Sequence, residues 1–345
     1  MRSRKERSDH CRRCVFGAFG RLQPDGKDFM NRRFFLFPAL LAGLCAAAPL
    51  AMAQSDAPGT GRAVITVLPK NDKQPTADVS QQAVKVEVNG KQTILSNWQP
   101  LRGSQSNIEL VILIDSGAHV SLGRQMGELQ HFVTSLPPNV KVSFAYMENG
   151  RAALAGPLTG NHALAVQGLH LPAGQPGSSA SPYFCLSDLA KRWPSNDLNA
   201  AREVLMITDG VDQYERRYDP DDPYVQAAIN DSARAHLVVY SIYWLSNGRA
   251  DRSGYENNAG QNLLLQVDQA TGGRSYWQGM GNPVTFQPYF DDLNRRFNNQ
   301  YELQFTAPIK NKAEIANLKV KTTDSKVKVD APQRVLVAPQ GAARE

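Results

Sequence analysis

The middle of the chain alternates between short apolar runs and longer segments with helical periodicity. Residues 110–114, 204–208 and 237–244 are apolar at nearly every position, as in strands that are covered on both faces. Between these runs, apolar residues recur every two to four positions in 120–136 and 182–193, which is typical of amphipathic helices. Strands that alternate with helices predict a doubly wound, mostly parallel, Rossmann-like α/β sheet with helices on both faces.

The two flanks of this region follow a different period. In 62–99, and again after Tyr301, apolar and polar residues alternate as in half-buried strands, and Asn89-Gly90 is a hairpin turn signal. Neither flank contains enough strands to cover its own apolar face. We therefore expect the two flanks to pair into one small β-sandwich beside the α/β domain.

These patterns predict four parts in chain order. Residues 1–53 form an N-terminal extension with a signal peptide, and 62–100 supply the first strands of the sandwich. Residues 107–300 form the α/β domain, and 301–338 supply the last strands of the sandwich. The segment 54–61, which consists of small and polar residues, is expected to be a flexible tail.

The N-terminal part has the layout of a secretory signal peptide. Arg32 and Arg33 follow Met30, an apolar stretch runs from Phe34 to Leu50, and Ala51-Met52-Ala53 is a small-residue cleavage site. We expect translation to start at Met30 and cleavage to follow Ala53, which gives a secreted or periplasmic bacterial protein without a membrane span. The alternative is a retained anchor, although the apolar stretch is shorter than the roughly 20 residues that a helix needs to cross a bilayer.

The formal net charge of +6 lies entirely in this leader. Residues 1–53 hold ten Lys and Arg but four Asp and Glu, whereas the rest of the chain carries 28 charges of each sign. A balanced body offers no electrostatic footprint for a phosphate backbone, so we expect no nucleic-acid partner.

Candidate chemistry lies in the loops that follow the apolar runs. Ligands of doubly wound sheets bind at the carboxyl ends of the strands. Asp115 follows the first run, Asp209 follows the second, and the Ser-rich segment 177–181 precedes a predicted helix. We expect these loops to meet at one edge of the sheet, where their carboxylate and hydroxyl oxygens suit Mg²⁺ or Ca²⁺.

Two of these segments carry a family resemblance. LVILIDSGAHV from Leu110, followed later by VLMITDG from Val204, resembles the metal-ion-dependent adhesion site of von Willebrand factor A domains. ATGGRSYW from Ala270, and the return to strands at Tyr301, are similar to the secreted acidobacterial-type variant of that family. The resemblance covers 109–306 and, more loosely, both flanks. It implies an A-type domain that binds a partner rather than one that catalyses a reaction.

The resemblance also implies which residues form the adhesion site. The family has D-x-S-x-S in the first loop, a threonine in a later loop and an aspartate before a glycine. Asp115 and Asp209 match the two aspartates, and Ser181, with Ser179 as the alternative, stands for the threonine.

The chain departs from the family at both motif serines, because Gly117 and His119 occupy their places. We therefore expect a degenerate site that holds either no metal or a weakly bound Mg²⁺ or Ca²⁺. One hypothesis is that a protonated His119 replaces part of the ion's charge between Asp115 and Asp209. The alternative is that His119 points to solvent and that the carboxylates cap loop backbone.

A loop beside this site has the composition of a protein interface. Tyr214, Arg216, Arg217 and Tyr218 lie within 211–224, and Tyr and Arg are the residue types that protein interfaces favour. A protein partner is therefore the first expectation and a glycan the second. The alternative is a solvated loop.

The motifs of common enzymes are missing from the sequence. No G-x-S-x-G elbow, Walker loop or G-x-G-x-x-G follows a predicted strand. We expect an exported, non-enzymatic binding module. Two alternatives stay open: a metal-dependent hydrolase that uses Asp115 and Asp209, and a structural component of a cell-envelope assembly.

Overall fold

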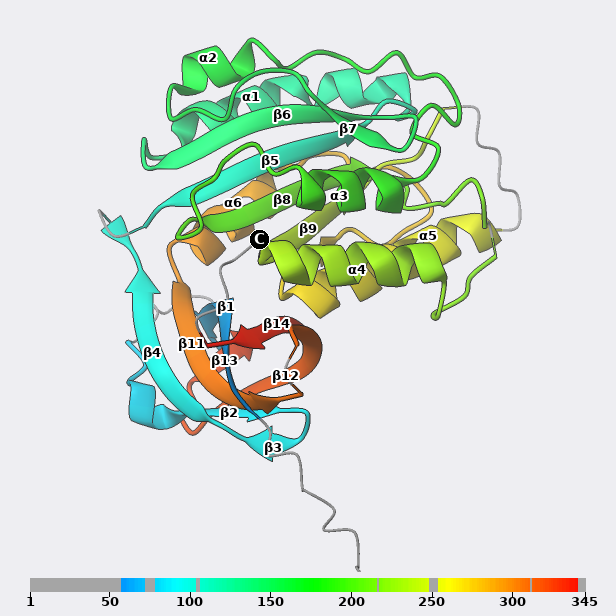
Figure 1. Ribbon diagram of the computed structural model, residues 1–345. Coiled ribbons are helices and arrows are strands. Elements are labelled where there is room, and N and C mark those ends of the chain that lie inside the picture. Colours follow the sequence, from blue (N-terminus) through cyan, green and yellow to red (C-terminus); the bar gives the residue numbers. More distant parts are fainter. Residues whose placement is uncertain are drawn as a thin grey trace, which may run out of the picture. The chain divides into compact units, whose positions relative to one another are not determined.

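The computed structural model describes residues 57–71, 78–103, 106–215, 217–247, 254–310 and 312–340. All of them belong to one compact unit, Gln54–Glu345 (Figure 1). The expected signal peptide, with its start at Met30 and its cleavage after Ala53, lies outside the described residues, and so does Arg216.

The first of two sheets is the predicted doubly wound one. Parallel pairing joins β5 to β6 and β8, β8 to β9, and β9 to β10, whereas β7 runs antiparallel to β6. The strands, in spatial order, are β10 (Ser275–Tyr276), β9 (Leu237–Tyr243), β8 (Ala201–Thr208), β5 (Ile108–Asp115), β6 (Val140–Glu148) and β7 (Arg151–Leu154).

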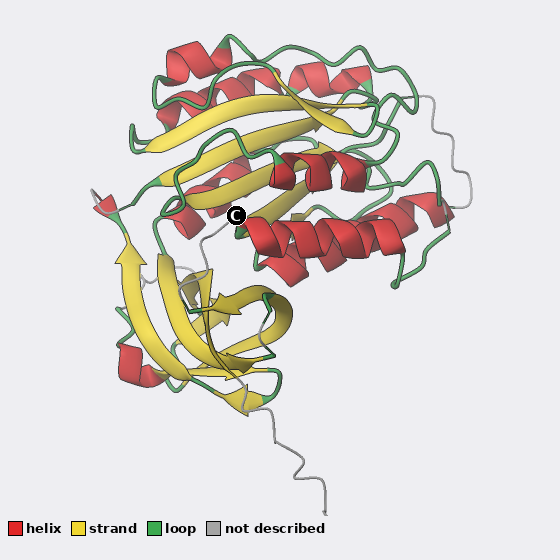
Figure 2. Cartoon of the chain, viewed as in Figure 1, coloured by secondary structure: helices red, strands yellow, loops and turns green. Residues whose placement is uncertain are grey.

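Helices cover both faces of this sheet, as the apolar strands predicted (Figure 2). They are η3 (Val120–Arg124), α1 (Met126–Ser135), α2 (His162–Val166), α3 (Pro182–Lys191), α4 (Pro223–Ala235), α5 (Tyr255–Thr271) and α6 (Gln287–Phe297). Alternate residues of β5 point to opposite faces, so that Leu110 and Ile112 pack with α1, α2 and α6. Val111 and Leu113 pack with α3, α4 and α5. Each face of the sheet therefore has its own apolar core, which packs the sheet against its helices.

The second sheet joins the two flanks of the chain, also as expected. Its strands, in order, are β3 (Lys91–Gln92), β2 (Val84–Val88), β12 (Glu314–Thr322), β14 (Arg334–Pro339), β1 (Ala57–Pro69), β11 (Gln300–Ile309) and β4 (Ile94–Leu101), and β13 (Val327–Asp330) pairs with β1. A short η1 (Gln81–Ala83) precedes β2. The hydrogen-bond path makes these strands one curled antiparallel sheet, and its division into the two layers of a sandwich stays a prediction.

One expectation about the first flank is wrong. The expected tail 54–61 is a strand from Ala57 onward, because β1 pairs with β11 from Ala57↔Ile309 to Thr66↔Gln300. Its small residues fit the facing side chains: a Cβ at Gly59 would lie 2.9 Å from Cδ1 of Ile309, and one at Gly61 would overlap the ring of Phe305. The glycines thus allow close packing between strands, a signal that resembles a flexible tail in sequence alone.

Buried polar contacts connect the two sheets. The side chain of Gln300 in β11 donates a hydrogen bond of 2.7 Å to the carboxyl group of Glu203 in β8. Burial raises the pKa of Glu203 to about 8, so this group is a neutral acid at neutral pH. Arg62 of β1 donates to the backbone carbonyl of Asn199 at 2.7 Å. The second sheet is therefore tied to the N-terminal end of β8, opposite to the edge that carries the candidate site.

Within the described part of the chain, no helix is both long and apolar enough to cross a membrane.

Candidate functional site

Three loops meet at the carboxyl edge of the parallel sheet, as the sequence predicted. Asp115 is the last residue of β5, and Asp209 directly follows β8. The Ser-rich loop before α3 reaches both neighbours, since the amide of Asn149 donates to the carbonyl of Ser178 and the amide of Gln213 donates to that of Ala180.

Asp115 is buried at the centre of this edge, with 1% of its surface exposed. One carboxylate oxygen accepts the amide hydrogen of Gly117 at 2.8 Å, and the other accepts the hydroxyl of Thr208 at 2.8 Å. Burial, and after it the charge of Asp209, raise the pKa of Asp115 to about 6, although the bonds from Thr208, Gly117 and Ser179 lower it. The site therefore holds a carboxyl group that is partly protonated near neutral pH.

The other acidic groups bond to nearby loop backbone and hydroxyls. Asp209 accepts the amide hydrogen of Val211 at 3.0 Å. Asp212, which the sequence reasoning did not single out, is fully buried and accepts the hydroxyl of Ser181 at 2.8 Å and the amide of Tyr214 at 2.7 Å. Burial raises the pKa of Asp212. The only sequence signal for Asp212 was its position directly after the apolar Val211, which is a weak one.

The two candidate serines therefore have different places. Ser181 bonds to Asp212, whereas Ser179, the alternative, contributes the hydrogen bond to Asp115. Both serines are buried. The threonine that bonds to Asp115 is Thr208, which comes from the strand before Asp209 and not from the Ser-rich loop.

Backbone closes over Asp115. A Cβ at Gly117 would lie 3.2 Å from the Asp115 carboxylate and 3.3 Å from the carbonyl oxygen of Gln175, so the Gln175 backbone lies directly over this position. The amide of Gly174 donates to the carbonyl of Ser116 at 3.0 Å. Asn247, in the loop after β9, binds both neighbouring loops: its backbone amide donates to Gly117 and its side chain to Gly174. These hydrogen bonds connect three loops at the edge of the sheet next to Asp115.

The described residues at this edge form no acidic cluster of the kind that holds a divalent ion. Both oxygens of Asp115 are engaged by Gly117 and Thr208. No group of three or more His, Cys, Asp or Glu among the described residues is arranged to hold a metal. Asp115 and Asp209 are both buried, so neither carboxylate is open to a partner at the surface.

His119 caps the short helix η3. Its Nδ1 accepts the amide hydrogen of Ser121 at 3.1 Å and lies 2.8 Å from the hydroxyl of the same residue. A ring nitrogen that accepts a hydrogen bond from a backbone amide is unprotonated. This geometry gives no support to the hypothesis that a protonated His119 replaces the ion.

An exposed aromatic cluster lies beside the closed edge. Phe184 of α3 is 5.3 Å from Tyr214 and 4.7 Å from Tyr224, measured between ring centroids, and the two tyrosines are 6.4 Å apart. Tyr214 is 65% exposed and Tyr224 is 41% exposed. We call these three residues the aromatic cluster. The sequence pattern does not indicate Phe184, because the apolar side of this helix is formed by Tyr183, Leu186 and Leu189.

Arg217 and Tyr218 of the predicted interface lie outside the aromatic cluster. Arg217 is exposed, and its amide donates to Glu215. Tyr218 is 42% exposed, lines a groove between α4 and α5, and donates its amide hydrogen to the hydroxyl of Tyr255. The predicted interface loop therefore contributes to two surfaces.

The strand order of the parallel sheet is that of a doubly wound domain. Numbered along the chain, the sheet reads 3-2-1-4-5-6, the order of doubly wound nucleotide-binding folds. Its first edge strand is antiparallel, and the two aspartates follow its central strands β5 and β8. This arrangement agrees with the fold that the resemblance to von Willebrand factor A domains implied for the α/β part. We call this part the A-like domain.

Neither the protein-family models nor the curated proteins contain a match to this sequence. Among solved structures, an aerotolerance-related membrane protein from Bacteroides fragilis is 15% identical over 55% of this chain and 98% of its own, with a TM-score of 0.41. The pilus adhesin SpaC from Lactobacillus rhamnosus GG is 8% identical over 79% of this chain and 49% of its own, with a TM-score of 0.41.

A third similar structure is proximal thread matrix protein 1 from the mussel byssus, which has a zinc-occupied MIDAS motif. It is 10% identical over 61% of this chain and 48% of its own, with a TM-score of 0.37. These scores are low, so the description of the A-like domain depends on its strand order and on the positions of Asp115 and Asp209.

Proposed function

We propose that the protein is an exported, non-enzymatic binding module whose A-like domain recognises a protein partner without a metal ion. The observation that carries the proposal is the aromatic cluster, which is exposed at the same edge where the aspartates are buried. Recognition then occurs through side chains on the surface of the edge and not through an ion beneath it. Export is proposed from the signal-peptide pattern that ends at Ala53.

The aromatic cluster has the properties of an interface anchor. Tyr and Phe bury large areas on binding and lose few rotamers, because each has two side-chain torsions. The backbone beneath them is fixed: Asp212 accepts the amide of Tyr214, and Asp222 accepts the amide of Tyr224 at 2.8 Å. A surface that is already ordered loses little conformational entropy when a partner docks.

The test is a binding experiment with variants of the cluster. The purified chain is immobilised, a partner is captured from a cell-envelope fraction and identified, and its affinity is measured with Tyr214→Ala. We expect an affinity loss of about tenfold or more with an unchanged melting temperature. The matched control is Ile94→Ala, which removes an apolar side chain that is 76% exposed on β4. Equal affinity of Tyr214→Ala and the control would reject the aromatic cluster as the interface.

The ion-free part of the proposal has its own test. Isothermal titration of Mg²⁺, Mn²⁺ and Ca²⁺ into the purified chain should give no saturable heat, because Gly117 and His119 replace the two motif serines and remove their hydroxyl ligands. Saturable binding of any of these ions that disappears in Asp115→Asn would show instead that the loops open to admit a metal.

An enzyme is the second candidate, because the raised pKa of Asp115 beside Asp209 resembles an acid–base pair. Against it stands the burial of both carboxylates, which leaves a substrate no contact with them. A hydrolase would show turnover that Asp115→Ala abolishes. A structural role in an envelope assembly would instead show co-purification in a large complex that Tyr214→Ala leaves intact.

A further inference from the structure

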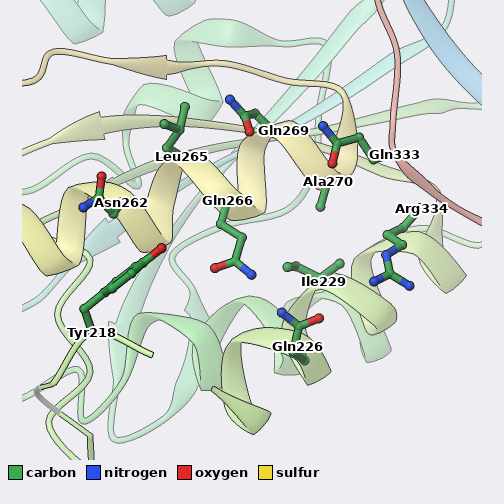
Figure 3. A pocket seen from close by; sticks show the side chains of 10 residues that line it. All are labelled: Tyr218, Gln226, Ile229, Asn262, Leu265, Gln266, Gln269, Ala270, Gln333 and Arg334. Carbon is green, nitrogen blue, oxygen red and sulfur yellow. The ribbon is translucent and has the colours of Figure 1, made fainter. Parts of the chain in front are cut away.

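A polar groove of about 310 Å³ lies between α4 and α5, away from the aspartates. Its lining is rich in side-chain amides and also includes apolar side chains (Figure 3). The amides are those of Gln226, Asn262, Gln266, Gln269 and Gln333, and the apolar residues are Ile229, Leu265 and Ala270. Figure 3 shows Gln266 and Gln226 between Tyr218 at one end and Arg334 at the other.

The amides come from a regular helical stripe. Asn262, Gln266 and Gln269 follow one another at spacings of four and three, so they lie on one face of α5. Gln226 faces them from α4, and its side-chain NH₂ and that of Gln266 both donate to the carbonyl of Pro220, at 3.1 and 2.7 Å. The shared acceptor fixes both side chains and directs their carbonyl oxygens away from it.

The polar groups of the groove differ in accessibility. Oε1 of Gln266 is buried and has no hydrogen-bond partner among the described residues. Asn262 and Gln269, by contrast, are exposed, so their amides are open to a ligand. At the other end, Arg334 is only half-buried and forms no ion pair within the part of the chain that the structure describes.

We propose that this groove binds a short saccharide that carries a carboxylate, such as a uronic acid. Amides offer a donor and an acceptor side by side, which matches neighbouring sugar hydroxyls, and the amides of Asn262, Gln269 and Gln333 are exposed. The apolar residues of the lining and the face of Tyr218 suit the C–H face of a pyranose ring. The guanidinium of Arg334 pairs with the carboxylate, and no acidic side chain in the lining repels it.

The size of the groove agrees with a small ligand, since pockets for small molecules begin at roughly 300 Å³. The groove is lined by Tyr218, which adjoins the loop of the aromatic cluster, but it contains none of the cluster's three residues. The saccharide site is therefore separate from the proposed protein interface, and either can fail without the other.

The experiment is an NMR titration of the purified chain with digalacturonic acid, in parallel with cellobiose as a neutral disaccharide and a short uncharged peptide. We expect saturable shifts with digalacturonic acid and weaker binding of cellobiose. Gln266→Leu should weaken both saccharides about tenfold, and Arg334→Gln should remove the preference for the acid. The matched controls are Gln130→Leu and Arg124→Gln, exposed residues of α1 and η3 that should change neither affinity.

Three results would overturn the proposal. They are equal affinity for the acidic and neutral disaccharides, saccharide binding that survives both Gln266→Leu and Arg334→Gln, and binding of the peptide in place of both saccharides. Melting temperatures of all variants within a few degrees of the wild type would show that a loss of binding is not a loss of fold.

Discussion

Asp115 destabilises the folded chain at neutral pH. Its pKa in the folded chain is about 6, whereas an aspartate in an unfolded chain has a pKa of about 3.9. The folded state therefore holds the proton more tightly, so the contribution of Asp115 to stability is greatest below pH 4 and is lost as the pH rises from about 4 through 6. The cause is burial and, after it, the charge of Asp209.

Asp115→Asn should consequently stabilise the protein at pH 8, by about 1–3 kcal/mol in the free energy of unfolding, and by much less at pH 4. The amide keeps an acceptor for Gly117 and offers a donor to Thr208. Urea denaturation at the two pH values measures the difference. The control is Asp188→Asn, because bonds from Arg192 and the Ala152 amide lower the pKa of Asp188, and its removal should destabilise at pH 8. A destabilised Asp115→Asn at pH 8 would contradict the argument.

At the scale of elements, two glycines that look alike in the sequence have opposite roles. A Cβ at Gly61 in β1 would overlap the Phe305 ring, whereas one at Gly127 in α1 would meet nothing within 4 Å. We expect Gly61→Ala to destabilise by about 1–3 kcal/mol through overpacking, and Gly127→Ala to stabilise by about 0.5–1 kcal/mol through helix propensity. Thermal and urea unfolding measure the change in stability of both variants. A change in the free energy of unfolding with the same sign in both would refute the assignment of β1.

The start of α4 gives a second test at this scale. Asp222 is buried at the N-cap, where its side chain accepts the amides of Tyr224 and Val225 at 2.8 and 3.0 Å. Asp222→Ala should cost about 1 kcal/mol of stability. Its neighbour Asp221 is exposed, so Asp221→Ala should change stability by less than about 0.5 kcal/mol. Equal effects in urea denaturation would mean that the acidic run acts only through its charge.

How far the sequence predicts this molecule also depends on the element. The central strands were predictable because β5 and β8 are apolar on both faces, and that pattern alone brought Asp115 and Asp209 to one edge. The aromatic cluster could not be predicted from the sequence, because Phe184 lies 30 residues before Tyr214. Their contact depends on how α3 packs against α4 and the loop that precedes it. The strand at Gly61 was hidden because glycine signals both a flexible tail and close packing.

At the scale of the whole molecule, the two sheets are connected through a buried neutral acid. Glu203 in β8 accepts a hydrogen bond from Gln300 in β11, and burial raises its pKa to about 8. Because an unfolded glutamate has a pKa of about 4.3, the folded state binds the proton more tightly, and stability falls as the pH rises from about 4 to 8. Above pH 8 the charged carboxylate weakens the junction, although the charge of Arg296 offsets part of the effect.

Glu203→Gln should remove the loss of stability at high pH, since the glutamine is neutral at every pH and keeps an acceptor for Gln300. We expect the variant to exceed the wild type by at least about 2 kcal/mol at pH 9 and to match it near pH 4. Urea denaturation across this range measures both values. Because Asp115 lies at the end of β5, on the opposite edge of the sheet from Glu203, the double variant with Asp115→Asn should show additive gains, as distant sites do. A pH profile that Glu203→Gln leaves unchanged would mean that Glu203 is already ionised in the folded chain, and that the junction is held by a charge.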